Sequence, residues 1–226
     1  MTMLDQRLKP GMGADAMRAA MVSSQLRTTG VDDVRVVGAM ATVAREDFVP
    51  PASRGVAYRD TAVPLGRGRY LNPPLATGRL VTEAQVLQRD RVLLIGAATG
   101  YTAAVLAMLG ASVVAVEEDA GLLAIAREAL DGVEGIELVE APLTAGHPDG
   151  APYDVLLVDG AVEALPDALL AQLRPGGRVA TGLADRGVTR LASGRRTEGG
   201  SGLFAFADAE CVVLPGFARP TGFRFG

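Results

Sequence analysis

Apolar and polar positions along the chain form blocks that predict strands separated by helices. The clearest apolar run, Val92–Ile95, predicts a buried strand. A turn of small residues, Gly96–Gly100, follows it and leads into a helical apolar pattern over Tyr101–Leu109. A second apolar run, Val113–Val116, ends at the acidic residue Glu117. Strand, glycine-containing turn, helix, strand and acid in this order are typical of a βαβ unit that binds a nucleotide.

The remaining pattern extends this unit in both directions. Helical spacing is expected at 15–29, at 32–43 with Asp32 as N-cap, and at 77–88, with turn-forming residues over 58–74. Further helices are expected at 121–130 and 165–173, and strands at 136–139, 155–158, 178–183, 188–193 and 203–214, with a loop at 194–202. This alternation predicts an α/β fold with a doubly wound, mostly parallel sheet whose C-terminal edge is antiparallel.

The candidate site lies where the predicted strands end. Ligands of such sheets bind beyond the carboxyl ends of the strands, where Gly96, Glu117 and Asp159 are expected. The glycine turn would allow close approach of a ligand, and Glu117 would accept hydrogen bonds from ribose hydroxyls. A dinucleotide-binding turn needs glycine at three positions that here hold Gly96, Ala98 and Tyr101, and no phosphate-binding Gly-Lys-Ser/Thr is present. The pattern therefore favours another ligand that contains adenosine.

Composition narrows the class of protein. The chain has 226 residues, 49% of them hydrophobic, and a formal net charge of −4. This length suits one α/β domain with a short N-terminal elaboration. The single cysteine, Cys211, excludes an intramolecular disulfide; we expect it to be a buried small apolar residue. The single histidine, His147, is expected in a surface loop, and no metal site is expected.

The sequence shows no secretory signal, no apolar stretch of about 20 residues and no basic cluster. We therefore expect a cytoplasmic protein that binds neither membranes nor nucleic acid. No heptad or long apolar helix indicates an oligomeric state.

Three segments resemble class I S-adenosylmethionine-dependent methyltransferases. The turn Gly96–Gly100 is similar to their cofactor turn, with Ala98 at its central glycine. The segments Tyr153–Asp159 and Leu169–Gly177 resemble their later motifs. This resemblance implies a Rossmann-like sheet of seven strands with a reversed last strand, S-adenosylmethionine as cofactor and S-adenosylhomocysteine as product.

Within this class, residues 21–183 resemble the protein-L-isoaspartate O-methyltransferase family. The motif Val43–Pro50 (VAREDFVP) is similar to the family's V-x-R-E-x-F-V-P, and Ile95–Ala104 is similar to its cofactor turn. The resemblance implies methylation of the carboxylate of L-isoaspartyl residues in damaged proteins or peptides, which is the first step of protein repair. It also implies that residues 1–75 form N-terminal helices and a substrate-side loop, and residues 76–226 a cofactor-binding domain, in one compact unit.

The resemblance also assigns site residues, some of which depart from the family. The family's catalytic serine falls on Asn72 and a neighbouring threonine on Tyr70, so the resemblance implies that these two are the catalytic residues. The acid of its first cofactor strand becomes Leu94. Its Gly-Asp-Gly falls on 141–143. The cofactor-binding residues expected are Gly96, Ala97, Ala98, Thr99, Gly100, Tyr101, Glu117, Glu118, Pro142, Leu143 and Asp159.

Alternatives remain open at this point. Asp159 has an alternative role as the cap of the following turn, and Glu118 and Asp119 as caps of the following helix. A carboxylate with a pKa near 4 is already ionised at neutral pH, so methylating it needs no general base. The departures leave two other functions possible, a methyltransferase with a different acceptor or a catalytically inactive protein that binds a partner.

Overall fold

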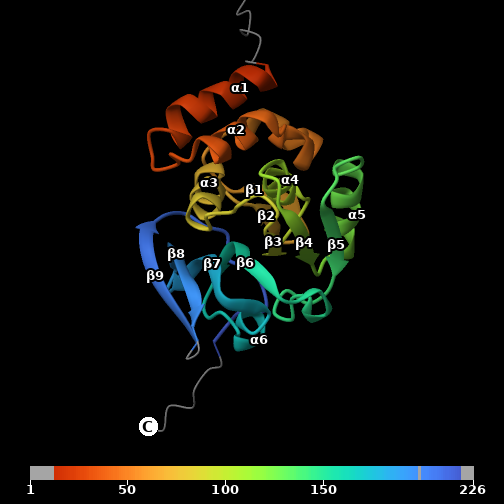
Figure 1. Ribbon diagram of the computed structural model, residues 1–226. Helices are drawn as coiled ribbons and strands as arrows, with labels where there is room; N and C mark the ends of the chain where they lie inside the picture. Colours follow the sequence, from red (N-terminus) through yellow and green to blue (C-terminus); the bar gives the residue numbers. More distant parts are fainter. Residues whose placement is uncertain (1–12, 198–199, 220–226) are drawn as a thin grey trace, which may run out of the picture.

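The computed structural model describes residues 13–197 and 200–219 (Figure 1). Within them, seven strands form one sheet in the order β5-β4-β3-β6-β7-β8-β9, and β1 and β2 form a separate hairpin. The strands are β1 (Val63–Gly66), β2 (Arg69–Leu71), β3 (Arg91–Ile95), β4 (Ser112–Glu117), β5 (Ile136–Glu140), β6 (Tyr153–Val162), β7 (Leu173–Asp185), β8 (Val188–Thr197) and β9 (Gly200–Asp208). The α-helices are α1 (Ala14–Met21), α2 (Val34–Thr42), α3 (Pro74–Glu83), α4 (Tyr101–Met108), α5 (Ala120–Ala129) and α6 (Asp167–Leu170).

The sheet confirms the predicted doubly wound α/β fold. Strands β5, β4, β3, β6 and β7 are parallel, with Ile95 beside Val116 of β4 and Val158 of β6. At the C-terminal edge β8 pairs antiparallel with both β7 and β9, so β8 is the reversed strand and β9 again follows the direction of the first five. The predicted antiparallel edge is therefore confirmed.

The apolar residues of β3 divide between the two faces of the sheet. Val92 and Leu94 belong to a core shared with α1–α5, whereas Leu93 and Ile95 belong to a second core with α6 and the C-terminal segment. This two-sided burial explains the continuous apolar run in the sequence. Figure 1 shows α1 and α2 beyond α3 and α4, and Met40 of α2 lies in the same core as Val92. The N-terminal helices therefore pack on the sheet domain; the proposed division at residue 75 stays a prediction.

Several element boundaries differ from the prediction. The N-cap of α2 is Asp33, whose carboxylate accepts from Arg35 N, and not Asp32. The expected helix at 165–173 contains only four helical residues. The expected loop at 194–202 belongs largely to β8 and β9, apart from residues 198–199, which lie outside the described residues, as do 1–12 and 220–226. Gly194 is needed there because a side chain would collide with the Gly202 carbonyl of the paired strand.

The turn-rich segment at 58–74 contains a hairpin that the sequence pattern did not indicate. Its strands β1 and β2 are joined through Arg67 and Gly68, whose φ angles of +55° and +73° suit a tight hairpin turn. No helix of the described residues could cross a membrane. Cys211 is buried, as predicted.

Candidate cofactor site

The predicted cofactor turn folds over the end of β4. The amides of Gly96 and Ala97 both donate to the Val116 carbonyl at 3.0 Å. Gly96 and Gly100 have φ angles of +79° and +97°, which favour glycine. A Cβ on Gly100 would lie 2.7 Å from a Leu130 methyl group, so the close packing of α5 also requires glycine at this position.

The turn and Glu117 meet, as the sequence predicted. Glu117 is fully buried, and its Oε2 accepts a hydrogen bond from Ala98 N at 2.8 Å. Its Oε1 accepts from the amides of Glu118 and Asp119 at 3.0 and 3.1 Å. Asp119 caps α5, since its side chain accepts from the amides of Gly121 and Leu122. Backbone amides of two segments therefore fix the Glu117 carboxylate at the edge of the turn.

Glu117 also has a partner that the sequence pattern did not indicate, the side chain of Arg69 on the hairpin. Arg69 Nη1 lies 2.5 Å from Glu117 Oε1, and Nη2 lies 2.9 Å from Oε2, so the ion pair is bidentate. Only 7% of the Arg69 side chain is exposed. Because β2 alternates between buried and exposed positions, Tyr70 points the other way and is 46% exposed. The alternation of buried and exposed positions would have predicted a buried Arg69 if residues 69–71 had been recognised as a strand.

Asp159 and Asn72 form a second buried polar cluster. Asp159 Oδ1 accepts from Asn72 Nδ2 at 2.8 Å and Thr77 Oγ1 at 3.2 Å, and Oδ2 accepts from Thr102 Oγ1 at 2.5 Å. Asn72 Oδ1 accepts from Val212 N at 2.8 Å. Both polar groups of the Asn72 side chain are thus engaged within the protein. Asp159 contacts three side chains here, and the alternative role as a turn cap is not observed.

The C-terminal segment covers the turn from the other side. Leu214 packs against Gly96, where an added Cβ would lie 2.9 Å from a Leu214 methyl group, and against Gly160. Backbone hydrogen bonds hold this segment to β6, from Ala161 N to Val212 O at 2.6 Å and from Leu214 N to Ala161 O at 2.9 Å. Leu214 therefore occupies the space between Gly160 and Gly96, a residue of the predicted site.

Two residues predicted to bind the cofactor direct their side chains toward the N-terminal segment. Tyr101 is fully buried, with its ring 5.7 Å from that of Phe48 and under the guanidinium of Arg45 at 4.6 Å. Thr99 Oγ1 donates to the Phe48 carbonyl at 2.6 Å. Burial raises the pKa of Tyr101 and lowers that of Arg45. These side chains anchor the segment of the V-x-R-E-x-F-V-P motif to the cofactor turn.

The loop after β5 lies beside Glu117 and Glu118. Ala141 N donates to the Glu117 carbonyl at 3.3 Å, and Leu143 N lies 3.5 Å from a Glu118 carboxylate oxygen. Leu143 is buried, whereas Pro142 is exposed. The structure thus brings all the acidic and loop residues predicted for the adenosine end of the site to one edge of the sheet.

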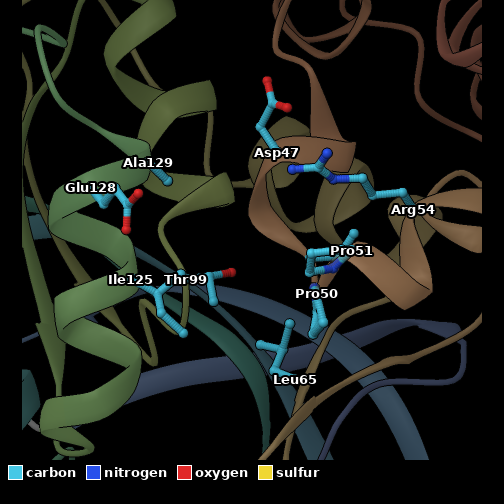
Figure 2. Close-up of a pocket in the computed structure, with 10 residues that line it drawn as sticks. Asp47, Pro50, Pro51, Arg54, Leu65, Thr99, Ile125, Glu128 and Ala129 are labelled. Atoms are coloured by element: carbon cyan, nitrogen blue, oxygen red, sulfur yellow. The ribbon is translucent and has the colours of Figure 1, made fainter.

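A cleft of about 600 Å³ opens next to the turn (Figure 2). Helix α5 forms one wall and the segment 47–54 the other. Among the described residues that line it, Thr99 is the only one predicted to bind the cofactor. The lining residues are Asp47, Val49, Pro50, Pro51, Arg54, Leu65, Thr99, Ile125, Glu128 and Ala129.

The sheet order, the glycine turn after β3 and the acid at the end of β4 define the class I S-adenosylmethionine-dependent methyltransferase fold. The same fold is found in a solved protein-L-isoaspartate O-methyltransferase, with a TM-score of 0.76 and 24% sequence identity over 88% of this chain and 66%, just under two thirds, of that one. It is also found in a Plasmodium falciparum structure in complex with S-adenosyl-L-homocysteine, with a TM-score of 0.74 and 16% identity over 90% of this chain and 98% of that one.

Sequence comparison identifies the family. The model of protein-L-isoaspartate(D-aspartate) O-methyltransferase matches residues 17–204. A protein-L-isoaspartate O-methyltransferase of Koribacter versatilis is 41% identical over 164 residues, which cover 72% of this chain and 74% of that protein. One from Methanoculleus marisnigri is 40% identical over 171 residues, covering 75% and 78%. The chain belongs to the protein-L-isoaspartate(D-aspartate) O-methyltransferase family, as its motifs predicted. Members of this family are S-adenosylmethionine-dependent protein carboxyl methyltransferases.

Proposed function

We propose that this chain transfers a methyl group from S-adenosylmethionine to the free α-carboxylate of L-isoaspartyl residues in damaged proteins or peptides. The observation that carries the proposal is the family match across residues 17–204, with relatives of about 40% identity over roughly three quarters of the chain. We further propose a cytoplasmic location, consistent with the single cysteine and testable by cell fractionation.

The residues of the site fit such a cofactor. Gly96 and Gly100 add no side chain at the two ends of the turn, and the buried Glu117 carboxylate would accept hydrogen bonds from ribose hydroxyls. The loop at 141–143 and Glu118 lie where they would border the adenine end. Arg69 Nε is buried without a hydrogen-bond partner, so the guanidinium that pairs with Glu117 has one unsatisfied N–H donor. Exchange of this guanidinium for ribose hydroxyls at Glu117 is therefore feasible.

The methyl transfer requires the protein mainly to position the reacting groups. When bound, S-adenosylmethionine supplies a methyl group on a positively charged sulfur. The acceptor carboxylate needs no deprotonation at neutral pH, so the chain must align the reacting groups and exclude water. Buried Leu214 and the Asn72–Asp159 cluster flank the turn and suit the exclusion of water. His147 is not required, and it bonds through its backbone amide to Gln172 outside this cluster.

A methyl-transfer assay tests the proposal. The protein is incubated with labelled S-adenosylmethionine and an isoaspartyl peptide, and base-labile methyl ester is measured against the matching aspartyl peptide. We expect ester on the isoaspartyl peptide only. Absence of ester with cofactor binding shown by calorimetry would indicate another acceptor, and absence of cofactor binding would indicate a partner-binding protein; either result contradicts the proposal.

Alanine variants of two glutamates test whether the cofactor binds at Glu117. Glu117→Ala should abolish detectable cofactor binding, because it removes the only carboxylate that hydrogen-bonds to the turn Gly96–Gly100 among the described residues. Glu134→Ala, an exposed carboxylate in the turn after α5, is the matched control and should bind as wild type does. Unchanged binding by Glu117→Ala would contradict the ribose-binding role of Glu117.

A further inference from the structure

We propose that Arg69 competes with the cofactor for Glu117, so that the cofactor binds only by displacing this guanidinium. The inference rests on the proposed function and adds a residue that sets cofactor affinity. Arg69 and Glu117 are both buried, and each carboxylate oxygen of Glu117 faces one Nη of Arg69. The guanidinium therefore stands where ribose hydroxyls would bond.

The hydrogen-bond capacity of Glu117 makes the two partners exclusive. Five N–H groups converge on its carboxylate, two from Arg69 and one each from the amides of Ala98, Glu118 and Asp119. A carboxylate offers about four lone-pair positions, so it has no room for two ribose hydroxyls as well. The three amides are fixed by the turn and by the start of α5. The donors that can leave are those of Arg69.

Few contacts hold the Arg69 side chain in place, as expected for a group that is displaced from Glu117. Among the described residues, the Arg69 side chain makes polar contacts only with Glu117, through its two Nη atoms, and its Nε has no partner. Arg69 lies on the short β1–β2 hairpin, which is separate from the main sheet. A second ion pair, from Arg67 Nε to Asp119 Oδ2 at 2.6 Å, links this hairpin to α5, but 62% of the Arg67 side chain is exposed. An exposed pair of this kind contributes little to holding the hairpin.

The charge of Arg69 explains why the pair forms without cofactor. A buried carboxylate without a counter-charge is costly, and Arg69 supplies that charge from within the chain. The same pair must be broken when the cofactor binds, so it lowers cofactor affinity. Removing the guanidinium while keeping an uncharged polar side chain should therefore tighten binding.

Calorimetry with S-adenosylhomocysteine tests this competition. Arg69→Gln should bind at least about tenfold more tightly than wild type, a change of about 1.4 kcal/mol. Arg67→Gln removes a neighbouring arginine of the same hairpin and should stay within about twofold of wild type. Equal or weaker binding by a folded Arg69→Gln would overturn the proposal. Tighter binding by both variants would do so too, because it would indicate a general effect of charge.

A measurement on the wild-type protein keeps the proposal testable if Arg69→Gln does not fold. Hydrogen exchange should become faster in the hairpin 63–71 and slower in the turn 96–101 when S-adenosylhomocysteine saturates the site. An unchanged or slower hairpin overturns the proposal. Tighter binding by Arg69→Gln without isoaspartyl methylation leaves the Arg69 proposal standing and contradicts the proposed acceptor. Failure of both wild type and Arg69→Gln to bind contradicts both proposals.

Discussion

Replacing Glu117 by glutamine should destabilise the fold through a specific partner, Arg69. The substitution keeps the shape of the side chain but removes the charge from a carboxylate that accepts five N–H groups. Because N–H donors face both carboxylate oxygens, the NH₂ group of the new glutamine must face N–H donors with which it cannot form hydrogen bonds. The buried guanidinium of Arg69 also loses its counter-charge. Breaking a buried ion pair by removing one partner costs about 3–5 kcal/mol. We therefore expect a loss of this size in the free energy of unfolding, a large fraction of the roughly 5–15 kcal/mol that is usual for a protein.

The partner substitution, Arg69→Met, has a smaller expected cost. It leaves the Glu117 carboxylate with its three backbone amides, and the methionine fills part of the volume of the arginine side chain. We expect a loss of about 1–3 kcal/mol. In the double variant neither charge remains, so its total loss should fall short of the sum of the single losses by at least about 2 kcal/mol.

Guanidinium chloride unfolding followed by circular dichroism measures all four proteins. The slope of the free energy against denaturant should stay constant across them, which shows that the same surface is exposed on unfolding. A loss below about 1 kcal/mol for Glu117→Gln would refute the reasoning. Additive losses within about 0.5 kcal/mol would refute the pairing even if each single loss were large.

Three further predictions concern other parts of the fold. Gly100→Ala should lower the free energy of unfolding by about 1–3 kcal/mol, because φ is +97° and the new Cβ would lie 2.7 Å from Leu130; denaturation showing no loss would contradict this packing. Burial raises the pKa of Cys211 to about 12, so Ellman's reagent at about pH 8 should label the thiol only after unfolding, and rapid labelling of the native protein would count against this burial. The hydrogen bond from Arg67 lowers the pKa of Asp119 in the folded state, so its contribution to stability is present above its unfolded pKa near 4 and is lost as pH falls through the lower folded value. Asp119→Asn should therefore lose less stability than wild type in urea titrations between about pH 6 and pH 3; an equal loss would argue against that role.

The central βαβ unit could be predicted because its signals are local. Val92–Ile95 is apolar at every position since the strand is buried on both faces, and the turn that follows must bend within a few residues. The hairpin at 63–71 was not predicted, because its proline and glycines suggest turns when the pairing partner is unknown. The strand character of 194–197 was missed for a similar reason, since Gly194 serves the close approach of the paired strand.

The candidate site likewise contains some contacts that the sequence predicts and others that it does not. The meeting of Gly96–Gly100 with Glu117 follows from strand order, which the alternation of elements already implies. The Arg69–Glu117 pair joins residues 48 positions apart, and the bond from Val212 to Asn72 joins residues 140 apart. Such contacts depend on how distant segments fold over the sheet edge, and a single sequence carries no spacing rule for them.

The position of the C-terminal segment has a consequence for how the protein is made. Val212 bonds to Asn72, and Leu214 covers Gly96, so residues from the last part of the chain complete a site whose other members were synthesised much earlier. Domains emerge from the ribosome with the N-terminal part first. A nascent chain must therefore be extended through Leu214 before this site exists, and a product that ends before Cys211 would carry the cofactor turn with one side uncovered.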